Sequence, residues 1–270
     1  MDYEMKKAGS GKELAVLYLK RYEKAKSIRQ KWEGLFQECY EYALPMRETF
    51  YTQTQGERRD DKIFDETAVV GVQEFASRLQ SGLVPNFARW ADFTSGSEVP
   101  KGERDAINNQ LDEVTDYVFE ILQNSNFAQE VHESFMDLAV GTGVLYVSEG
   151  DAVHPVKFSA LPLPHVVLDV GPDDNIDHVY RERTIRNSEI EIVYPKAKMS
   201  DELKNAVMAN PEGKAKILEV VCRNYSKVNE DAYYSIVIEE NTKTVLKHDD
   251  LKGTGSNPFL CFRWSKCAGE

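Results

Sequence analysis

Two glycine-containing segments have the composition of nucleotide-binding loops. Residues 9–12 (GSGK) resemble part of a phosphate loop, in which backbone N–H groups and a lysine bind phosphate oxygens. A working loop also needs a preceding strand, a fuller glycine spacing and Ser or Thr after the lysine, whereas Glu13 follows here. Residues 141–143 (GTG) lack the third glycine of a dinucleotide fingerprint. We interpret the first segment as part of a flexible N-terminus and the second as a helix-to-strand hinge, and we assign no cofactor-binding residue.

The side chains that bind metals also lack a recognisable pattern. Five histidines show neither i, i+4 pairing nor a nearby cysteine, so no zinc site is predicted: His132, His154, His165, His178 and His248. Residues 173–177 (DDNID) crowd several oxygens together, but they miss the order of a calcium loop and its final glutamate, which favours a turn. An alternative, a divergent metal-dependent hydrolase, would use Asp173, Asp174 and Asp177. We assign no catalytic or metal-binding residue and predict that the chain is not an enzyme.

The composition favours a folded and soluble protein. Of the 270 residues 41% are hydrophobic and 10% aromatic, which excludes an intrinsically disordered chain. No apolar run approaches the roughly 20 residues of a membrane span, and the N-terminus lacks the apolar stretch of a signal peptide. The net charge of −12 argues against broad wrapping of nucleic acid. Four cysteines without close spacing are expected to be reduced thiols in a cytoplasm: Cys39, Cys222, Cys261 and Cys267.

The charge is unevenly distributed along the chain. Residues 1–31 carry nine Lys or Arg and four Asp or Glu, whereas residues 98–137 carry two Lys or Arg and ten Asp or Glu. The simplest interpretation is two solvated helix faces. A second interpretation is that the basic helix of one copy, with Lys20, Arg21 and Lys24, meets the acidic helix of another copy.

The first half of the sequence has the periodicity of helices, which would carry these charges. Apolar residues recur every three or four positions over residues 14–43, and Pro45 should end this helix. Residues 46–64 are polar and without periodicity, so we expect an extended loop or arm. Asp65 is a candidate N-cap for a second helix that Pro85 stops.

Two further helices are predicted after a linker. Residues 86–102 are expected to form a loop and a short strand, and residues 107–121 carry the most regular helical stripe. Asn126 and Gln129 resemble a capping box that starts a helix extending through Leu138. Six aromatic residues at element boundaries or on apolar stripes are expected in the core: Trp32, Tyr42, Trp90, Phe93, Phe135 and Trp264.

The second half of the sequence has the pattern of strands. Short β-prone runs separated by turn residues follow the hinge, at residues 144–147, 153–158, 166–170, 179–186, 190–193, 217–225, 233–239, 244–246 and 259–264. One short helix is expected at residues 200–208. Because strands and helices do not alternate as in βαβ units, we predict an α+β fold with a helical N-terminal half, a strand-rich second half and no parallel βαβ sheet.

Several short motifs together resemble one protein family. In order they are Trp32, residues 42–45 (YALP), 64–68 (FDETA), 76–85 (ASRLQSGLVP), 89–90 (RW), 135–138 (FMDL), 141–145 (GTGVL), 257–259 (NPF), 263–264 (RW) and 269–270 (GE). Each motif is weak alone, but their order and spacing over nearly the whole chain are specific. By these residues the chain resembles the head-to-tail connector (portal) proteins of short-tailed bacteriophages.

The resemblance implies a structural role in the virus particle. It implies a dodecameric ring at one capsid vertex, which assembles with scaffolding and major capsid proteins and docks the terminase motor. Double-stranded DNA would pass through this ring without sequence-specific binding, and tail adaptor proteins would attach to it. The motor hydrolyses ATP, so the connector itself would need no cofactor. The resemblance also implies no contact with a membrane. Its location would be the portal vertex of the virion, after assembly in the host cytoplasm.

The resemblance also implies a domain organisation. Residues 1–140 would form the mainly helical part of the wing region, and residues 141–270 its β-rich part. In this family the chain normally continues past the Gly-Glu pair into a Tyr-Gly-rich stretch, stem helices, the clip and the crown. Because this sequence ends at Glu270, we expect those parts to be missing. An assembly adaptor or scaffold protein of another kind, or the divergent hydrolase above, are the alternative functions.

Overall fold

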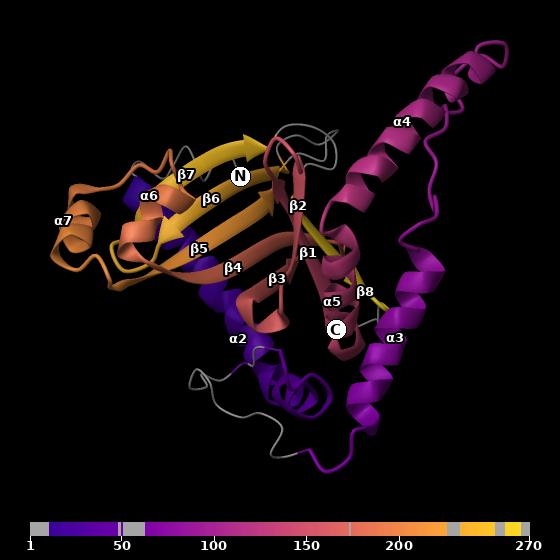
Figure 1. Ribbon diagram of the computed structural model, residues 1–270. Coiled ribbons are helices and arrows are strands. Elements are labelled where there is room, and N and C mark those ends of the chain that lie inside the picture. The colour runs from indigo at the N-terminus through magenta and orange to yellow at the C-terminus, as the bar shows by residue number, and fades with distance from the viewer. Residues whose placement is uncertain are drawn as a thin grey trace. The chain divides into compact units, whose positions relative to one another are not determined.

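The computed structural model describes residues 11–47, 50, 63–172, 174–225, 233–251 and 257–265 (Figure 1). Helices dominate the first half and strands the second, so the prediction of an α+β fold is confirmed. All strand pairs in the described part of the chain are antiparallel, as expected for a chain without βαβ units.

The described helices are α2 (Gly11–Ala43), α3 (Thr67–Leu83), α4 (Arg104–Asn124), α5 (Phe127–Val140), α6 (Ile190–Val193) and α7 (Asp201–Ala209), with short 3₁₀ helices η1 (Leu163–His165) and η2 (Asn187–Glu189). The described strands are β1 (Thr142–Glu149), β2 (Val156–Ala160), β3 (Val166–Val170), β4 (Ile176–Arg186), β5 (Lys214–Arg223), β6 (Tyr233–Glu239), β7 (Thr244–Leu251) and β8 (Phe259–Arg263). No helix in these ranges combines the length and the apolar character that crossing a bilayer requires.

The chain divides into two compact units, and each contains helices and strands. Unit 1 comprises Met1–Leu35 and Leu163–Asn257, and unit 2 comprises Phe36–Pro162 and Pro258–Glu270. Helix α2 contributes to both units. The division at residue 140 follows secondary-structure content, and as a domain boundary of a wing region it remains a prediction.

Unit 1 is built on a sheet with the strand order β3-β4-β5-β6-β7, which is buried on both faces. Residues 11–35 of α2 cover one face, where Tyr18 and Tyr22 pack with Leu218 and other buried residues of the sheet. The opposite face buries Ile217 beside Ile190 of α6. Neighbouring residues of β5 therefore serve different cores, which follows from the two-residue period of a strand.

Unit 2 combines a sheet of strand order β2-β1-β8 with helices α3, α4 and α5. Its core joins Ala76 of α3 to Val131, Phe135 and Leu138 of α5. Within this unit α4 extends away from α3 and α5, and the chain that precedes it runs alongside (Figure 1). Helix α4 therefore exposes most of its surface.

Proline and glycine set the helix ends where the sequence predicts them. Helix α2 ends at Ala43, two residues before Pro45, and α3 ends at Leu83, two residues before Pro85. The hinge is also confirmed, because α5 ends at Val140 and β1 begins at Thr142. A Cβ atom added at Gly143 would lie 2.3 Å from the ring of Phe262, so only glycine fits under that ring.

Asp65 supports the start of α3 from one position further out than expected. The N-cap position belongs to Glu66, which makes no side-chain capping bond. The Oδ1 atom of Asp65 instead accepts a 2.8 Å hydrogen bond from the backbone N–H of Thr67, the first residue of the helix. The same atom accepts a 2.5 Å hydrogen bond from the hydroxyl of Thr67, and this bond, together with the backbone bond, lowers the pKa of the exposed Asp65 carboxyl. Most of the loop expected at residues 46–64 lies outside the described residues.

Three local predictions are wrong. Residues 190–193 form helix α6 rather than a strand. This helical turn buries Ile190 completely in the core of unit 1, and that burial outweighs the β-propensity of residues 190–193. The linker at residues 86–102 contains no strand. Its backbone N–H groups bond to side chains of α4 instead, as Phe93 does to Thr115 at 3.2 Å. The capping box at Asn126 is absent, since this residue makes no side-chain cap.

Candidate functional site

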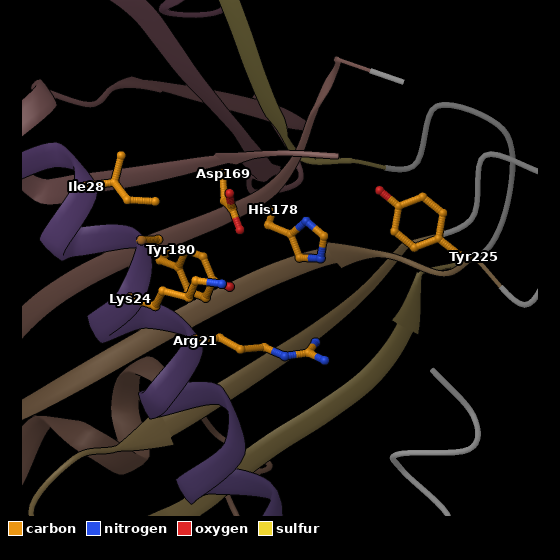
Figure 2. A pocket seen from close by; sticks show the side chains of 8 residues that line it. Arg21, Lys24, Ile28, Asp169, His178, Tyr180 and Tyr225 are labelled. Atoms are coloured by element: carbon orange, nitrogen blue, oxygen red, sulfur yellow. The ribbon is translucent and has the colours of Figure 1, made fainter. Parts of the chain in front are cut away.

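A pocket lies beside α2 in unit 1 and collects polar side chains from the helix and from the sheet (Figure 2). Its volume is about 530 Å³. Helix α2 contributes two cations, and strands β3 and β4 with the residues after β5 contribute the other polar groups: Arg21, Lys24, Asp169, His178, Tyr180 and Tyr225. The sequence indicated the two cations, whereas no motif marked the residues of the strands.

Two of these groups have unsatisfied hydrogen-bonding capacity within the described part of the chain. Tyr180 is only 1% exposed, and its hydroxyl has no hydrogen-bond partner there. The buried Nδ1 atom of His178 has none either. Burial lowers the pKa of His178, Asp169 opposes this shift and Arg21 adds to it. A buried polar group without a partner is costly, so this pocket is suited to a ligand that supplies one.

The acidic turn predicted at residues 173–177 lies near one end of this pocket, and Asp173 itself is outside the described residues. Asp174 has a φ of 57°, and its N–H donates to the carbonyl of Gly171 at 3.1 Å, as in a turn. Asp177 is 1% exposed and accepts a 2.5 Å hydrogen bond from the hydroxyl of Tyr225. A Cβ atom at Gly171 would lie 2.0 Å from Oδ2 of Asp177, so glycine makes room for this bond.

Asp177, one of the three residues named for the alternative hydrolase, is engaged by other side chains. The Oδ2 atom of Asp177 also lies 3.7 Å from Arg223, so the tyrosine and the arginine already occupy this carboxylate. Over the described ranges, no group of three or more His, Cys, Asp or Glu side chains is arranged to hold a metal ion. A turn stabilised by a buried carboxylate describes residues 174–177 best.

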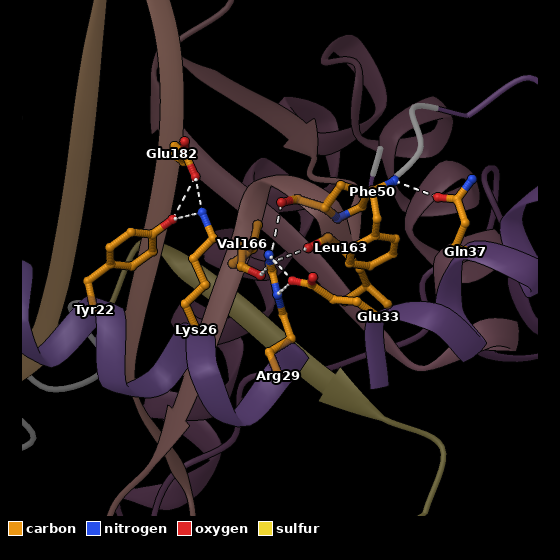
Figure 3. A network of polar contacts seen from close by, with 10 residues as sticks. Tyr22, Lys26, Arg29, Glu33, Gln37, Phe50, Leu163, Val166 and Glu182 are labelled. Carbon is orange, nitrogen blue, oxygen red and sulfur yellow. Dashed lines mark hydrogen bonds and ion pairs between the residues drawn. The ribbon is translucent and has the colours of Figure 1, made fainter. Parts of the chain in front are cut away.

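Next to the pocket, α2 is fixed to the sheet by polar contacts (Figure 3). The hydroxyl of Tyr22 donates to Glu182 at 2.6 Å, and the ammonium of Lys26 lies 3.1 Å from the same Oε2 atom. Burial of Glu182 would raise its pKa, but these two partners outweigh burial, so the net pKa is lowered. The basic face of α2 is therefore partly structural.

Arg29 makes a second attachment, to the segment around η1 (Figure 3). Its Nη1 atom donates to the carbonyls of Leu163, Pro164 and Val166 at 3.2, 3.3 and 2.8 Å. Its Nη2 atom lies 2.9 Å from Glu33 one turn along α2. One guanidinium thus provides donors for three carbonyls of the short segment Leu163–Val166.

In unit 2 a buried polar cluster joins the end of α2 and the residues after it to α5. Asp137 is fully buried, and its Oδ1 atom accepts a 2.7 Å hydrogen bond from the hydroxyl of Tyr40. Arg47 forms ion pairs with Asp137 and, at 2.8 Å, with Glu133. Burial raises the pKa of Asp137, and Arg47 and Tyr40 oppose that shift. The role of Arg47 and Asp137 as a buried pair is not visible in the sequence, since ninety residues separate them.

Half of the ten acidic residues in the stretch at residues 98–137 lie on α4. Arg89 organises one side of it through ion pairs with Asp92, Asp112 and Asp116. Glu113, Tyr117 and Glu120 are exposed at spacings of four and three residues, so they share one face of the helix. We call these last three residues the α4 ridge. Tyr117 is 63% exposed.

Most of the aromatic residues predicted for the core do not lie in it. Phe135 is buried against Ala76, as expected. The other five are at least 40% exposed, which corrects the prediction: Trp32, Tyr42, Trp90, Phe93 and Trp264. Trp90 still contacts Phe119 edge-on, with ring centroids 5.3 Å apart. Aromatic side chains are enriched on surfaces that contact other proteins, so these five exposed residues are candidates for such contacts.

The remaining candidates have ordinary surroundings. Gly11 and Lys12 of the GSGK segment lie in α2, so this half of the segment is helical and not part of a flexible N-terminus as predicted. Lys12 forms an exposed 3.4 Å ion pair with Glu202. The Nδ1 atom of His132 lies 2.9 Å from the Oε1 atom of Gln80. The described cysteines are free thiols: Cys39, Cys222 and Cys261. Cys267 lies outside the described residues.

The described residues thus include charged helix faces and exposed aromatic side chains, which are typical of surfaces that contact other macromolecules. The chain matches, over residues 16–270, the model of the family described as bacteriophage head to tail connecting protein, and it belongs to this family. The resemblance stated from the sequence is therefore confirmed. The chain is also 25% identical over 189 residues to a probable portal protein of Bordetella phage BPP-1. The alignment covers 68% of this chain but only 33% of that protein, so the chain spans about a third of this relative's length.

Proposed function

We propose that this chain is a structural subunit of a portal, the connector between head and tail at one vertex of a bacteriophage capsid. The observation that carries the proposal is the family match over residues 16–270. The similarity to a probable portal protein supports it. Twelve copies would form a ring that serves as the conduit for double-stranded DNA during packaging and ejection.

The partners in this proposal follow from that position in the particle. Scaffolding and major capsid proteins surround the ring during head assembly in the host cytoplasm, the terminase motor docks on it during packaging, and tail adaptor proteins bind it afterwards. The motor supplies the ATP hydrolysis, so the chain acts without catalysis or cofactor. The net charge of −12 supports passage without binding, because an excess of carboxylates repels the phosphates of DNA.

Immunogold labelling of proheads and virions from the phage that encodes the chain tests this function. We expect label at a single vertex, the one that carries the tail. Label spread over the capsid, or its absence from particles, would instead indicate an assembly adaptor or scaffold. Negative-stain images of the purified chain complement the test, since a portal subunit with sufficient interface forms rings with a central channel.

A further inference from the structure

The pocket beside α2 has the donors of an anion-binding site. Arg21 and Lys24 bring two positive charges against the single carboxylate of Asp169. The buried hydroxyl of Tyr180 and the Nδ1 atom of His178, which donates in the tautomer protonated there, have no partner within the described residues. A carboxylate or phosphate oxygen would satisfy such groups and gain from the two cations. The exposed part of α2 at Ile28 extends the same pocket with an apolar wall.

The same chain presents a surface of matching character on α4. The α4 ridge places one exposed carboxylate on each side of Tyr117, one helical turn away in either direction. Its neighbour Val114 is 49% exposed, so the ridge combines negative charge with apolar area. Basic and acidic surfaces of mixed apolar character are therefore present in different units of one subunit.

We propose that the pocket of one copy receives the α4 ridge of the next copy in an assembly. This inference rests on the proposed ring, because a closed ring repeats one heterologous contact between two different surfaces of each subunit. Carboxylates of Glu113 and Glu120 approach Arg21 and Lys24, and Tyr117 packs toward Ile28. A single pairing of surfaces thus accounts for the separation of charge along the sequence.

Charge reversal on each surface tests this contact. In the full chain, Arg21→Glu with Lys24→Glu gives an acidic pocket, and Glu113→Lys with Glu120→Lys gives a basic ridge. The matched control is Lys214→Glu with Lys243→Glu, which changes the same charge in unit 1 at exposed positions. Lys214 pairs in register with Arg186, whereas His178 of the pocket pairs with Cys222 at the other end of these strands.

The readout is self-association measured by sedimentation velocity, with circular dichroism melting to show that each variant folds. We expect each double variant to raise the dissociation constant roughly tenfold or more, because like charges then face one another. The control should associate as the wild type does. An equimolar mixture of the two double variants should regain association, since each acidic pocket then meets a basic ridge. Tyr180→Phe, which removes only a hydroxyl, should weaken association with little change in shape.

Several outcomes would overturn this inference. One is double variants that associate as well as the wild type, and another is a mixture that fails to recover. A wild-type chain that stays monomeric, while inorganic phosphate binds and Arg21→Glu with Lys24→Glu abolishes that binding, would show a site for free anions instead. A monomer that binds no phosphate would also reject the contact. Vertex labelling of particles does not depend on these results, so failure of the proposed contact can be distinguished from failure of the proposed portal function.

Discussion

The side chain of Asn126 forms two hydrogen bonds with the backbone of Phe158. Its Nδ2 atom donates to the carbonyl oxygen at 2.8 Å, and its Oδ1 atom accepts from the N–H at 2.9 Å. Phe158 belongs to β2, an outer strand of its sheet. Asn126 thus pairs with this strand as a further strand would, which explains why it does not cap α5.

Replacing Asn126 tests this pairing. Asn126→Ala leaves two backbone groups of β2 without partners and should lower the free energy of unfolding by about 1–3 kcal/mol. Asn126→Asp keeps the acceptor but turns a carboxylate oxygen toward the carbonyl of Phe158 and toward Glu130, so it should not recover the loss. Urea unfolding followed by circular dichroism measures both changes. Asn124→Ala, at an exposed position at the end of α4, is the matched control and should change stability little. Equal losses for the two alanine variants would contradict the pairing.

The buried cluster of unit 2 gives a second prediction. Arg47→Met leaves the fully buried Asp137 without its cation and should cost about 3–5 kcal/mol of stability. Tyr40→Phe removes one hydrogen bond to the same carboxylate and should cost about 1–3 kcal/mol. Combining Arg47→Met with Asp137→Asn should recover part of the loss, because no charge is then buried alone. Tyr42→Phe, on an exposed side chain, serves as control, and an Arg47→Met variant as stable as wild type would refute the cluster's role.

The sequence predicts those features of the fold that depend on neighbouring residues. Pro45 and Pro85 limit their helices through local geometry, and the alternation of β5 follows from the period of a strand. Features that depend on distant residues are not predictable in this way. The two unpartnered polar groups of the pocket, on His178 and Tyr180, come together with α2 only through the register of the sheet and the packing of the helix.

Asn126 shows the same limit at a single residue. Its position before an apolar helical stripe is typical of a cap, and only the proximity of Phe158 gives it a different partner. The exposed tryptophans are a second case in which the sequence pattern predicts the wrong surroundings. Trp32 and Trp264 lie on apolar patterns that indicate burial, but the sequence does not distinguish burial in one chain from burial between chains.

Arg29 gives a third prediction, about the attachment of α2 to η1. Arg29→Met removes donors from three carbonyls while keeping most of the apolar stem, and it should lower the free energy of unfolding by about 2–3 kcal/mol. Arg29→Lys should recover only part of the loss, because an ammonium lacks the planar fork. Arg78→Met is the control, since Arg78 also pairs with a glutamate four residues away but is exposed. Chemical denaturation of the three variants measures their free energies of unfolding. Equal losses for Arg29→Met and Arg78→Met would show that Arg29 does not attach α2 to η1.

The pH dependence of stability gives the last prediction, at His178. Burial lowers the pKa of this side chain, Arg21 of α2 adds to the shift, and Asp169 of β3 and Asp177 of β4 oppose it. Below pH about 6.5 the imidazole of the unfolded chain therefore takes up a proton that the folded chain does not bind. Linkage then requires stability to fall as the pH falls through this range, by at most about 1.4 kcal/mol per pH unit from this group.

Comparison with His178→Gln isolates that contribution. Glutamine does not titrate, so the variant should lose less stability than the wild type between pH 7.5 and pH 5.5, the interval chosen to bracket the ordinary histidine pKa. The control is His154→Gln, at an exposed position, which should follow the wild type throughout. Urea unfolding at a series of pH values gives both curves. Parallel curves for the wild type and His178→Gln would mean that the imidazole is protonated equally in both states, and the pocket would then be more open to water than its burial indicates.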